Sequence, residues 1–172
     1  MVEVHREEHT MTRVDVRTGM AFGDFVTALE RAAPPFDPEP MRRIVDAGGS
    51  WDDVRAAVTK NAPNHLMVYA RIDATPLFSV AGHRTQAVEY LIGNHVIAET
   101  MFRHDPRALL YAPLRVLVYS DADGNAVFTM DRPRTAFGSL NIPAVTEVGE
   151  GLDHKVSHLL AVAGVDVGPI FA

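Results

Sequence analysis

The sequence predicts an α+β fold in which helices pack on a mostly antiparallel sheet, with an inserted helical hairpin. Residues 115–120 and 125–130 are apolar strands, and the connection at 121–124 is so short that they must be antiparallel. Residues 143–163 carry an apolar stripe at helical spacing. The predicted order of elements, β-α-(αα)-β-β-α-β-β-α, is typical of helices laid against one sheet.

Length and composition favour a single domain of ordinary globular character. The chain has 172 residues, of which 47% are hydrophobic and 22% are charged. Its formal net charge of −6 is not offset by a basic tract, so we expect no nucleic-acid partner. The chain has no cysteine, which excludes disulfides, thiolate zinc sites and iron–sulfur clusters.

The start of the chain and its hydropathy predict a cytoplasmic protein without a membrane partner. Residues 1–8 are charged, are expected to be flexible, and do not resemble a signal peptide. No segment approaches the run of about twenty apolar residues that spans a bilayer. Residues 9–164 are predicted to form the single α+β domain, and residues 165–172 a C-terminal tail.

The first predicted elements are a strand and a helix. Residues 10–18 alternate apolar and polar side chains, which indicates a strand, and Gly19 ends it. Apolar side chains then recur at helical spacing over residues 21–33, which predicts an amphipathic helix that Pro34 and Pro35 stop.

Residues 34–63 are the predicted helical insertion. A helix over residues 39–47 ends at two glycines, and Ser50 followed by Asp53 is typical of the capping box that starts a second helix. The residues of this second helix expected to face inward are Trp51, Val54 and Val58. We expect a hairpin packed over a sheet face or one end of a pocket; the alternative is a mobile lid.

The remaining elements follow from apolar runs and the breakers between them. Residues 66–72 and 88–92 are predicted strands, and residues 76–80 a loop or a short strand. Residues 131–140 contain a proline and a glycine and are predicted to be a loop. The C-terminal tail is apolar and is expected either to dock on a partner subunit or to be disordered.

Two residue pairs in the last helix bear on its stability and chemistry. Gly149 and Gly151 are each expected to weaken it by about 1 kcal/mol relative to alanine. His154 and His158 have the i, i+4 spacing that lets two imidazoles share a metal. They fall opposite the apolar stripe, however, which predicts a solvated face.

Several short motifs resemble those of the domain of unknown function 302 family of bacterial proteins. That family shows an Asn-Pro turn, a short helix, an Asp-Pro, a Pro-Leu strand start and an Asp-Gly hairpin. The matching features here are Gly93-Asn94, Met101, Asp105-Pro106, the segment 112–116 and the hairpin 119–127. The resemblance covers residues 10–164 in layout and implies a fold and homodimerisation, but no reaction. The chain departs from the pattern at His95, where many relatives have proline, and in its helical insertion.

His95 is the candidate binding residue. Gly93 ends a strand and Asn94 is a good N-cap, so His95 is placed in the first turn of a short helix. The positive end of the helix dipole favours the neutral imidazole that a metal or a general base requires. The side chains expected to share a pocket with His95 are Tyr90, Glu99, Met101, Phe102 and Tyr111.

Three functions stay open for this segment. In the first, a homodimer binds a small apolar ligand in the pocket around His95. In the second, His95 ligates haem or another metal, with possible catalytic activity. In the third, the chain is a structural interaction domain without a ligand, in which the apolar surface is an interface and side chains fill the pocket. The sequence contains neither a nucleophile elbow nor a phosphate-binding loop.

Overall fold

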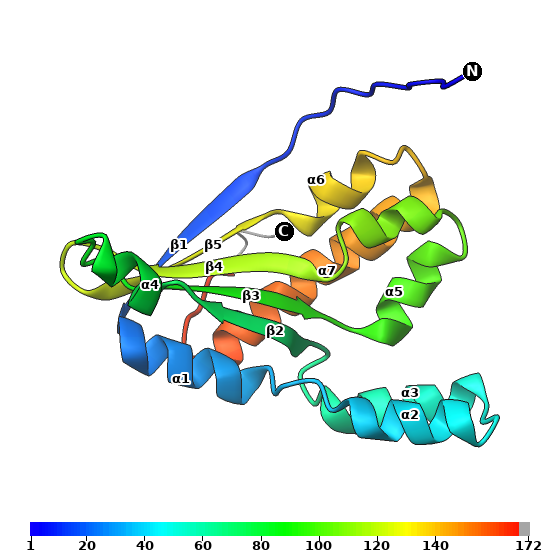
Figure 1. The fold of residues 1–172 in the computed structure, drawn as a ribbon, viewed down its shortest axis with the longest axis horizontal. Coiled ribbons are helices and arrows are strands. Elements are labelled where there is room, and N and C mark those ends of the chain that lie inside the picture. The colour runs from blue at the N-terminus through cyan, green and yellow to red at the C-terminus, as the bar shows by residue number, and fades with distance from the viewer. Residues whose placement is uncertain (169–172) are drawn as a thin grey trace.

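The fold is an α+β domain built on one five-stranded antiparallel sheet, as predicted (Figure 1). The computed structural model describes residues 1–168. The strands are β1 (Arg13–Ala21), β2 (Met67–Asp73), β3 (Ala87–Gly93), β4 (Leu114–Ser120) and β5 (Asn125–Asp131), in the spatial order β1-β5-β4-β3-β2. The helices are α1 (Phe22–Ala32), α2 (Pro38–Asp46), α3 (Trp51–Asn61), α4 (Thr75–Val80), α5 (His95–Phe102), the 3-10 helix η1 (Pro106–Leu110), α6 (Pro133–Gly138) and α7 (Pro143–Val162).

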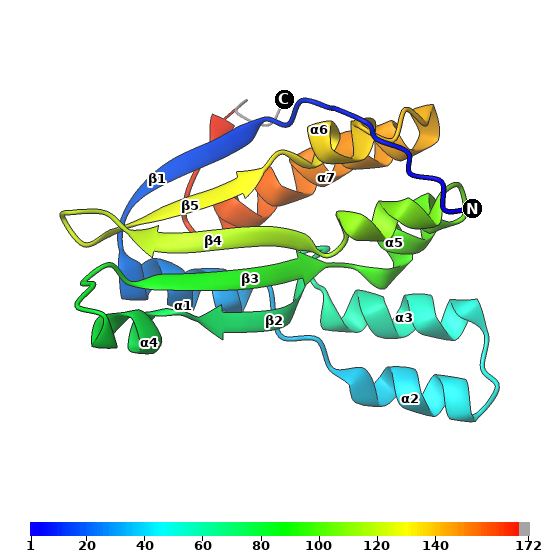
Figure 2. The same cartoon turned by 45° about the horizontal axis from the view of Figure 1, so that its top comes forward.

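Helices α1 and α7 cover one face of the sheet and form the main core with it (Figure 2). The predicted stripe of α7 faces this core, where Val145, Val156 and Leu159 are fully buried. The tail following α7 continues the core, because Val165 and Val167 are only 7% and 6% exposed. The described part of the tail therefore docks on its own chain, and residues 169–172 lie outside the described part.

The opposite face of the sheet carries no helix layer among the described residues (Figure 2). Its central apolar side chain Leu117 is 37% exposed, and Ile72 at its β2 side is 52% exposed. The free edge at β1 presents alternating charges on Arg13, Asp15 and Arg17. Charged side chains on an exposed edge strand disfavour pairing with another strand.

Two segments predicted without helix are short helices. Residues 76–80 were expected to be a loop or a strand and lie in α4, and residues 131–140 were expected to be a loop and contain α6. The physical reason is the same in both. Pro76 and Pro133 occupy the first helical turn, where proline's missing N–H costs nothing and its fixed φ favours helix.

Helices α2 and α3, in the segment predicted to be a helical insertion, form a hairpin that packs beside the sheet instead of over either face (Figure 2). Val58 of α3 is buried in a separate small cluster with Met67 of β2 and Val96 of α5. The capping box at the start of α3 is confirmed, since Ser50 N donates to Asp53 Oδ2 (2.8 Å) and Asp53 N donates to Ser50 Oγ (3.3 Å).

The expectation that Trp51 faces inward is wrong. Its side chain is 38% exposed. The reason is position: Trp51 begins α3 at the turn between the two helices, at the end of the hairpin that projects from the sheet (Figure 2).

Candidate functional site

The candidate site is built at the corner between β3 and α5. Asn94 is the predicted N-cap, and its Oδ1 accepts hydrogen bonds from the backbone N–H groups of Val96 (2.8 Å) and Ile97 (3.2 Å). Its Nδ2 donates to the carbonyl of His65 (2.8 Å), which ties the corner to the chain before β2. These bonds fix the direction in which the next side chain, His95, leaves the helix.

The glycine at the end of β3 lets a side chain of β2 approach its backbone closely. A Cβ at Gly93 would lie 3.2 Å from Cε2 of Tyr69 and 3.5 Å from Cα of Pro113. The Tyr69 ring therefore lies over Gly93. This position of the ring follows a β-bulge between Val68 and Ala70, which re-aims the side chain of β2.

His95 lies in an aromatic cluster with Tyr69 and Phe36. Tyr69 Oη and His95 Nδ1 form a hydrogen bond of 3.0 Å. The Phe36 ring meets the imidazole edge to face at 4.9 Å between centroids. Burial lowers the pKa of His95 and raises the pKa of the Tyr69 hydroxyl, so both groups are neutral at pH 7.

A cavity of about 250 Å³ opens beside this cluster. Its walls come from α5, η1, the start of β4, α6 and α7. The lining residues are Tyr69, Gly93, Asn94, His95, Ile97, Ala98, Met101, Leu109, Ala112, Pro113, Leu114, Phe137 and Leu152. Only Tyr69, Asn94 and His95 carry polar side chains, and the Asn94 amide already caps α5. The cavity is thus apolar with one polar corner.

The structure brings only part of the predicted residue set to this cavity. His95 and Met101 line it. Glu99 pairs with Arg103 on the other side of α5, and Phe102 is 48% exposed. Neither of them lines the cavity.

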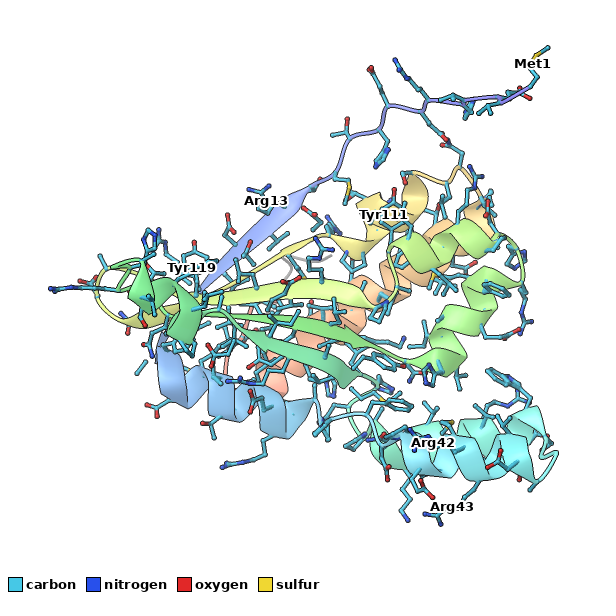
Figure 3. All side chains as sticks on the ribbon, in the orientation of Figure 1. Met1, Arg13, Arg42, Arg43, Tyr111 and Tyr119 are labelled. Carbon is cyan, nitrogen blue, oxygen red and sulfur yellow. The ribbon has the colours of Figure 1, made fainter. Side chains whose placement is uncertain are left out.

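The two predicted tyrosines lie elsewhere. Tyr90 is fully buried on the core face of β3, where its hydroxyl donates to Glu30 Oε1 (2.7 Å). Tyr111 lies beside α6 (Figure 3), and its hydroxyl accepts a hydrogen bond from Ser139 Oγ (3.2 Å). Tyr111 lines a second cavity, which does not include His95.

Sequence reasoning missed Tyr69 and Phe36. Tyr69 is 26 residues from His95 in the chain, and only the bulge in β2 brings the two rings together. Phe36 belongs to the connection between α1 and α2, where its N–H donates to the Val68 carbonyl (2.8 Å). The prolines around Phe36 indicate a loop. They do not indicate that the Phe36 side chain of this loop contacts the imidazole of His95.

The histidines do not gather into a metal site. No group of three or more His, Asp or Glu side chains within residues 1–168 is placed to hold a metal. His154 and His158 are both exposed, as expected. The ring nearest to His158 is that of His65, at 6.0 Å between centroids. Within residues 1–168, His95 thus belongs to no group of three such metal-binding side chains.

The low pKa of His95 predicts a pH dependence of stability. In the unfolded chain the imidazole of His95 is protonated near its ordinary pKa of 6.5, and in the folded chain it is protonated only at lower pH. The unfolded state thus binds more protons in this range, so the free energy of unfolding falls as the pH drops below 6.5. In urea titrations from about pH 8 to about pH 5, His95→Gln is expected to flatten this decline. The exposed His104→Gln is the control, and an unchanged slope in His95→Gln would contradict the prediction.

Comparisons with known proteins agree with this architecture. The family described as "Domain of unknown function DUF302" matches residues 44–162. A crystal structure of an uncharacterised conserved DUF302 protein from Bacillus stearothermophilus superimposes with a TM-score of 0.61 at 18% sequence identity, over 89% of this chain and 97% of that one. At this identity the likeness shows the fold. No curated protein matches the sequence. No helix in residues 1–168 is long and apolar enough to cross a membrane. The chain belongs to the DUF302 family.

Proposed function

We propose that this chain binds a small, largely apolar molecule in the cavity beside His95. The observation that carries the proposal is the lining: apolar side chains from five elements surround one neutral polar pair, Tyr69 and His95. Ligand sites usually combine an apolar wall with a few placed polar groups. A volume of about 250 Å³ is below the range typical of drug-sized ligands, so the ligand is small.

The hydrogen-bond pattern defines which polar group the ligand carries. Nδ1 of His95 is occupied by the Tyr69 hydroxyl, and Nε2 has no hydrogen-bond partner among the described residues. Whichever of Tyr69 and His95 donates, Nε2 is the nitrogen that remains. A hydroxyl on the ligand can either donate or accept, so it matches both tautomers of the neutral ring. We therefore expect a small aromatic or branched aliphatic alcohol to bind better than the matching hydrocarbon.

The cavity gives less support to haem or another metal. Nε2 of His95 is free of protein partners among residues 1–168, which an axial ligand needs. A haem macrocycle is larger than the cavity, however, and Phe36 lies edge-on against the ring. Haem titration of the purified protein tests this hypothesis directly, through a Soret band that His95→Ala abolishes.

Filling the cavity is expected to weaken ligand binding. Ala98 lines the cavity, and Ala98→Leu would place three more carbon atoms in it. With 4-methylphenol as the probe, we expect the Kd measured by calorimetry to rise by about tenfold or more. Ala161→Leu is the matched control, because Ala161 is exposed on α7 and does not line the cavity.

A second pair of measurements tests the polar corner. His95→Phe keeps an aromatic ring and removes Nε2. It is therefore expected to raise the Kd for 4-methylphenol and to leave the Kd for toluene nearly unchanged. Failure of the unaltered protein to bind either probe, or equal Kd values for Ala98→Leu and the unaltered chain, would contradict the proposed function.

Homodimerisation, which the sequence led us to expect, stays a prediction. If a dimer forms, the uncovered sheet face around Leu117 and Ile72 is the apolar surface available to it.

A further inference from the structure

A second cavity, of about 390 Å³, lies on the uncovered face of the sheet. One wall is the N-terminal segment, where His9 Nε2 lies 3.3 Å from Tyr111 Oη. Leu110 of η1 also lines the cavity. The floor is formed by the sheet itself and includes Arg115 and Asp131. Its volume lies within the range of sites for small molecules.

The floor of this cavity is one row of directly opposed residues across three strands. Leu91 of β3 pairs with Arg115 of β4. One step beyond the pair Val116–Met130, the β4–β5 register places Arg115 opposite Asp131. Directly opposed residues of antiparallel strands point to the same face of the sheet. The row therefore presents an acid, a base and an apolar side chain in that order.

The acid and the base of this row are not paired with each other. Arg115 turns toward β3, where its Nε contacts Glu89 Oε1 at 3.2 Å, and its side chain is 80% exposed. Asp131 forms no ion pair or side-chain hydrogen bond with any described residue. Opposite charges on directly opposed residues normally attract each other. Here the Asp131 carboxylate has no partner among the described residues, and Arg115 keeps guanidinium N–H groups that Glu89 does not use.

We propose that this second cavity binds a free α-amino acid with an apolar side chain. Asp131 receives the ammonium, and Arg115 binds the carboxylate through the guanidinium N–H donors that Glu89 leaves unused. Leu91, Leu110 and Pro113 take the side chain.

The proposal is independent of the site at His95. Pro113 and Leu114 border both cavities, but Tyr69 and His95 line only the first, and Arg115 and Asp131 only the second. The charge balance favours a zwitterion over a simple anion or cation. Asp131 is flanked by Arg115 on β4 and by Arg13, which opposes it on β1, while Glu89 already partners Arg115.

Calorimetric titration with three related probes tests the proposal. We expect L-leucine to bind, and both leucinamide, which lacks the carboxylate, and 4-methylpentanoate, which lacks the ammonium, to bind about tenfold more weakly. Asp131→Asn is expected to remove the preference for L-leucine over 4-methylpentanoate. Arg115→Gln is expected to remove its preference over leucinamide. Asp15→Asn is the control, since Asp15 lies on the same face outside the cavity.

Each possible result decides the question. Absence of L-leucine binding, equal affinity for the three probes, or unchanged preferences in Asp131→Asn and Arg115→Gln would overturn the proposal. Circular dichroism of each variant separates loss of binding from loss of fold. Because 4-methylphenol probes the cavity at His95, its binding is expected to be unaffected by Asp131→Asn.

Discussion

Replacing Asp153 with asparagine is expected to lower the free energy of unfolding by about 3 kcal/mol. Asp153 is 1% exposed on α7 and joins this helix to the start of α6. Its Oδ2 accepts a hydrogen bond from Arg132 Nε (2.6 Å), and its Oδ1 accepts one from the backbone N–H of Arg134 (3.1 Å). Asparagine has nearly the same shape, so the substitution removes the charge from a buried pair and leaves the packing intact.

Urea denaturation measures this effect, and the same helix offers a control. Glu150 forms an ion pair with Arg134 (3.0 Å), but both side chains are about half exposed. Exposed pairs contribute at most about 1 kcal/mol, so Glu150→Gln is expected to change stability little. If Asp153→Asn and Glu150→Gln lower the free energy of unfolding equally, the prediction that the buried Asp153 interaction contributes more than an exposed ion pair is wrong.

Replacing Gly149 with alanine is expected to destabilise the protein by about 1–3 kcal/mol, although alanine is the better helix former. A Cβ at Gly149 would lie 3.1 Å from Cβ of Phe137, 3.2 Å from Cα of Arg134 and 3.2 Å from the carbonyl oxygen of Pro133. Two of these three atoms belong to the backbone of α6. The short helix would therefore have to move away from α7 by a few tenths of an ångström, which strains the packing of the buried Phe137 ring.

Gly151→Ala, two residues further along α7, is expected to stabilise the protein. A Cβ there would meet only the flexible Nζ of Lys155, at 3.8 Å. The helix gains the propensity of alanine without a clash, so stability is expected to rise by about 0.5–1 kcal/mol. Thermal and urea unfolding of the two variants should give shifts of opposite sign. Stabilisation by both substitutions would mean that α6 shifts away from α7 at little cost.

Local signals explain which parts of the fold could be predicted. The N-cap at Asn94, the capping box at Ser50 and the hairpin at 121–124 each depend on residues within four positions, and all three are present. The sequence also placed Gly149 correctly inside a helix. It could not indicate that α6 lies against that glycine, because α6 itself begins at a proline that looks like a helix breaker.

The candidate site was predictable only at its helix start. His95 follows from the strand, glycine and N-cap pattern before it. Glu99 and Phe102 were predicted to face the same pocket as His95. In the structure a different face of α5, with Ile97, Ala98 and Met101, lines the cavity. Which side of a short helix is buried depends on α7 and η1, both distant in the chain. Tyr69 and Phe36 reach the imidazole through a bulge and a connection, for which the sequence offers no periodic signal.

The separate apolar cluster under the helical hairpin has a consequence for how this protein tolerates substitutions. Phe36, which contacts the imidazole, packs against this cluster and not against the large one beneath the sheet. Exchanges at Met41 or Val58 would thus reshape the neighbourhood of His95 while the residues that hold the strands together stay as they are. The residues that shape the surroundings of His95 can accordingly change independently of those that hold the sheet together, because they belong to different clusters.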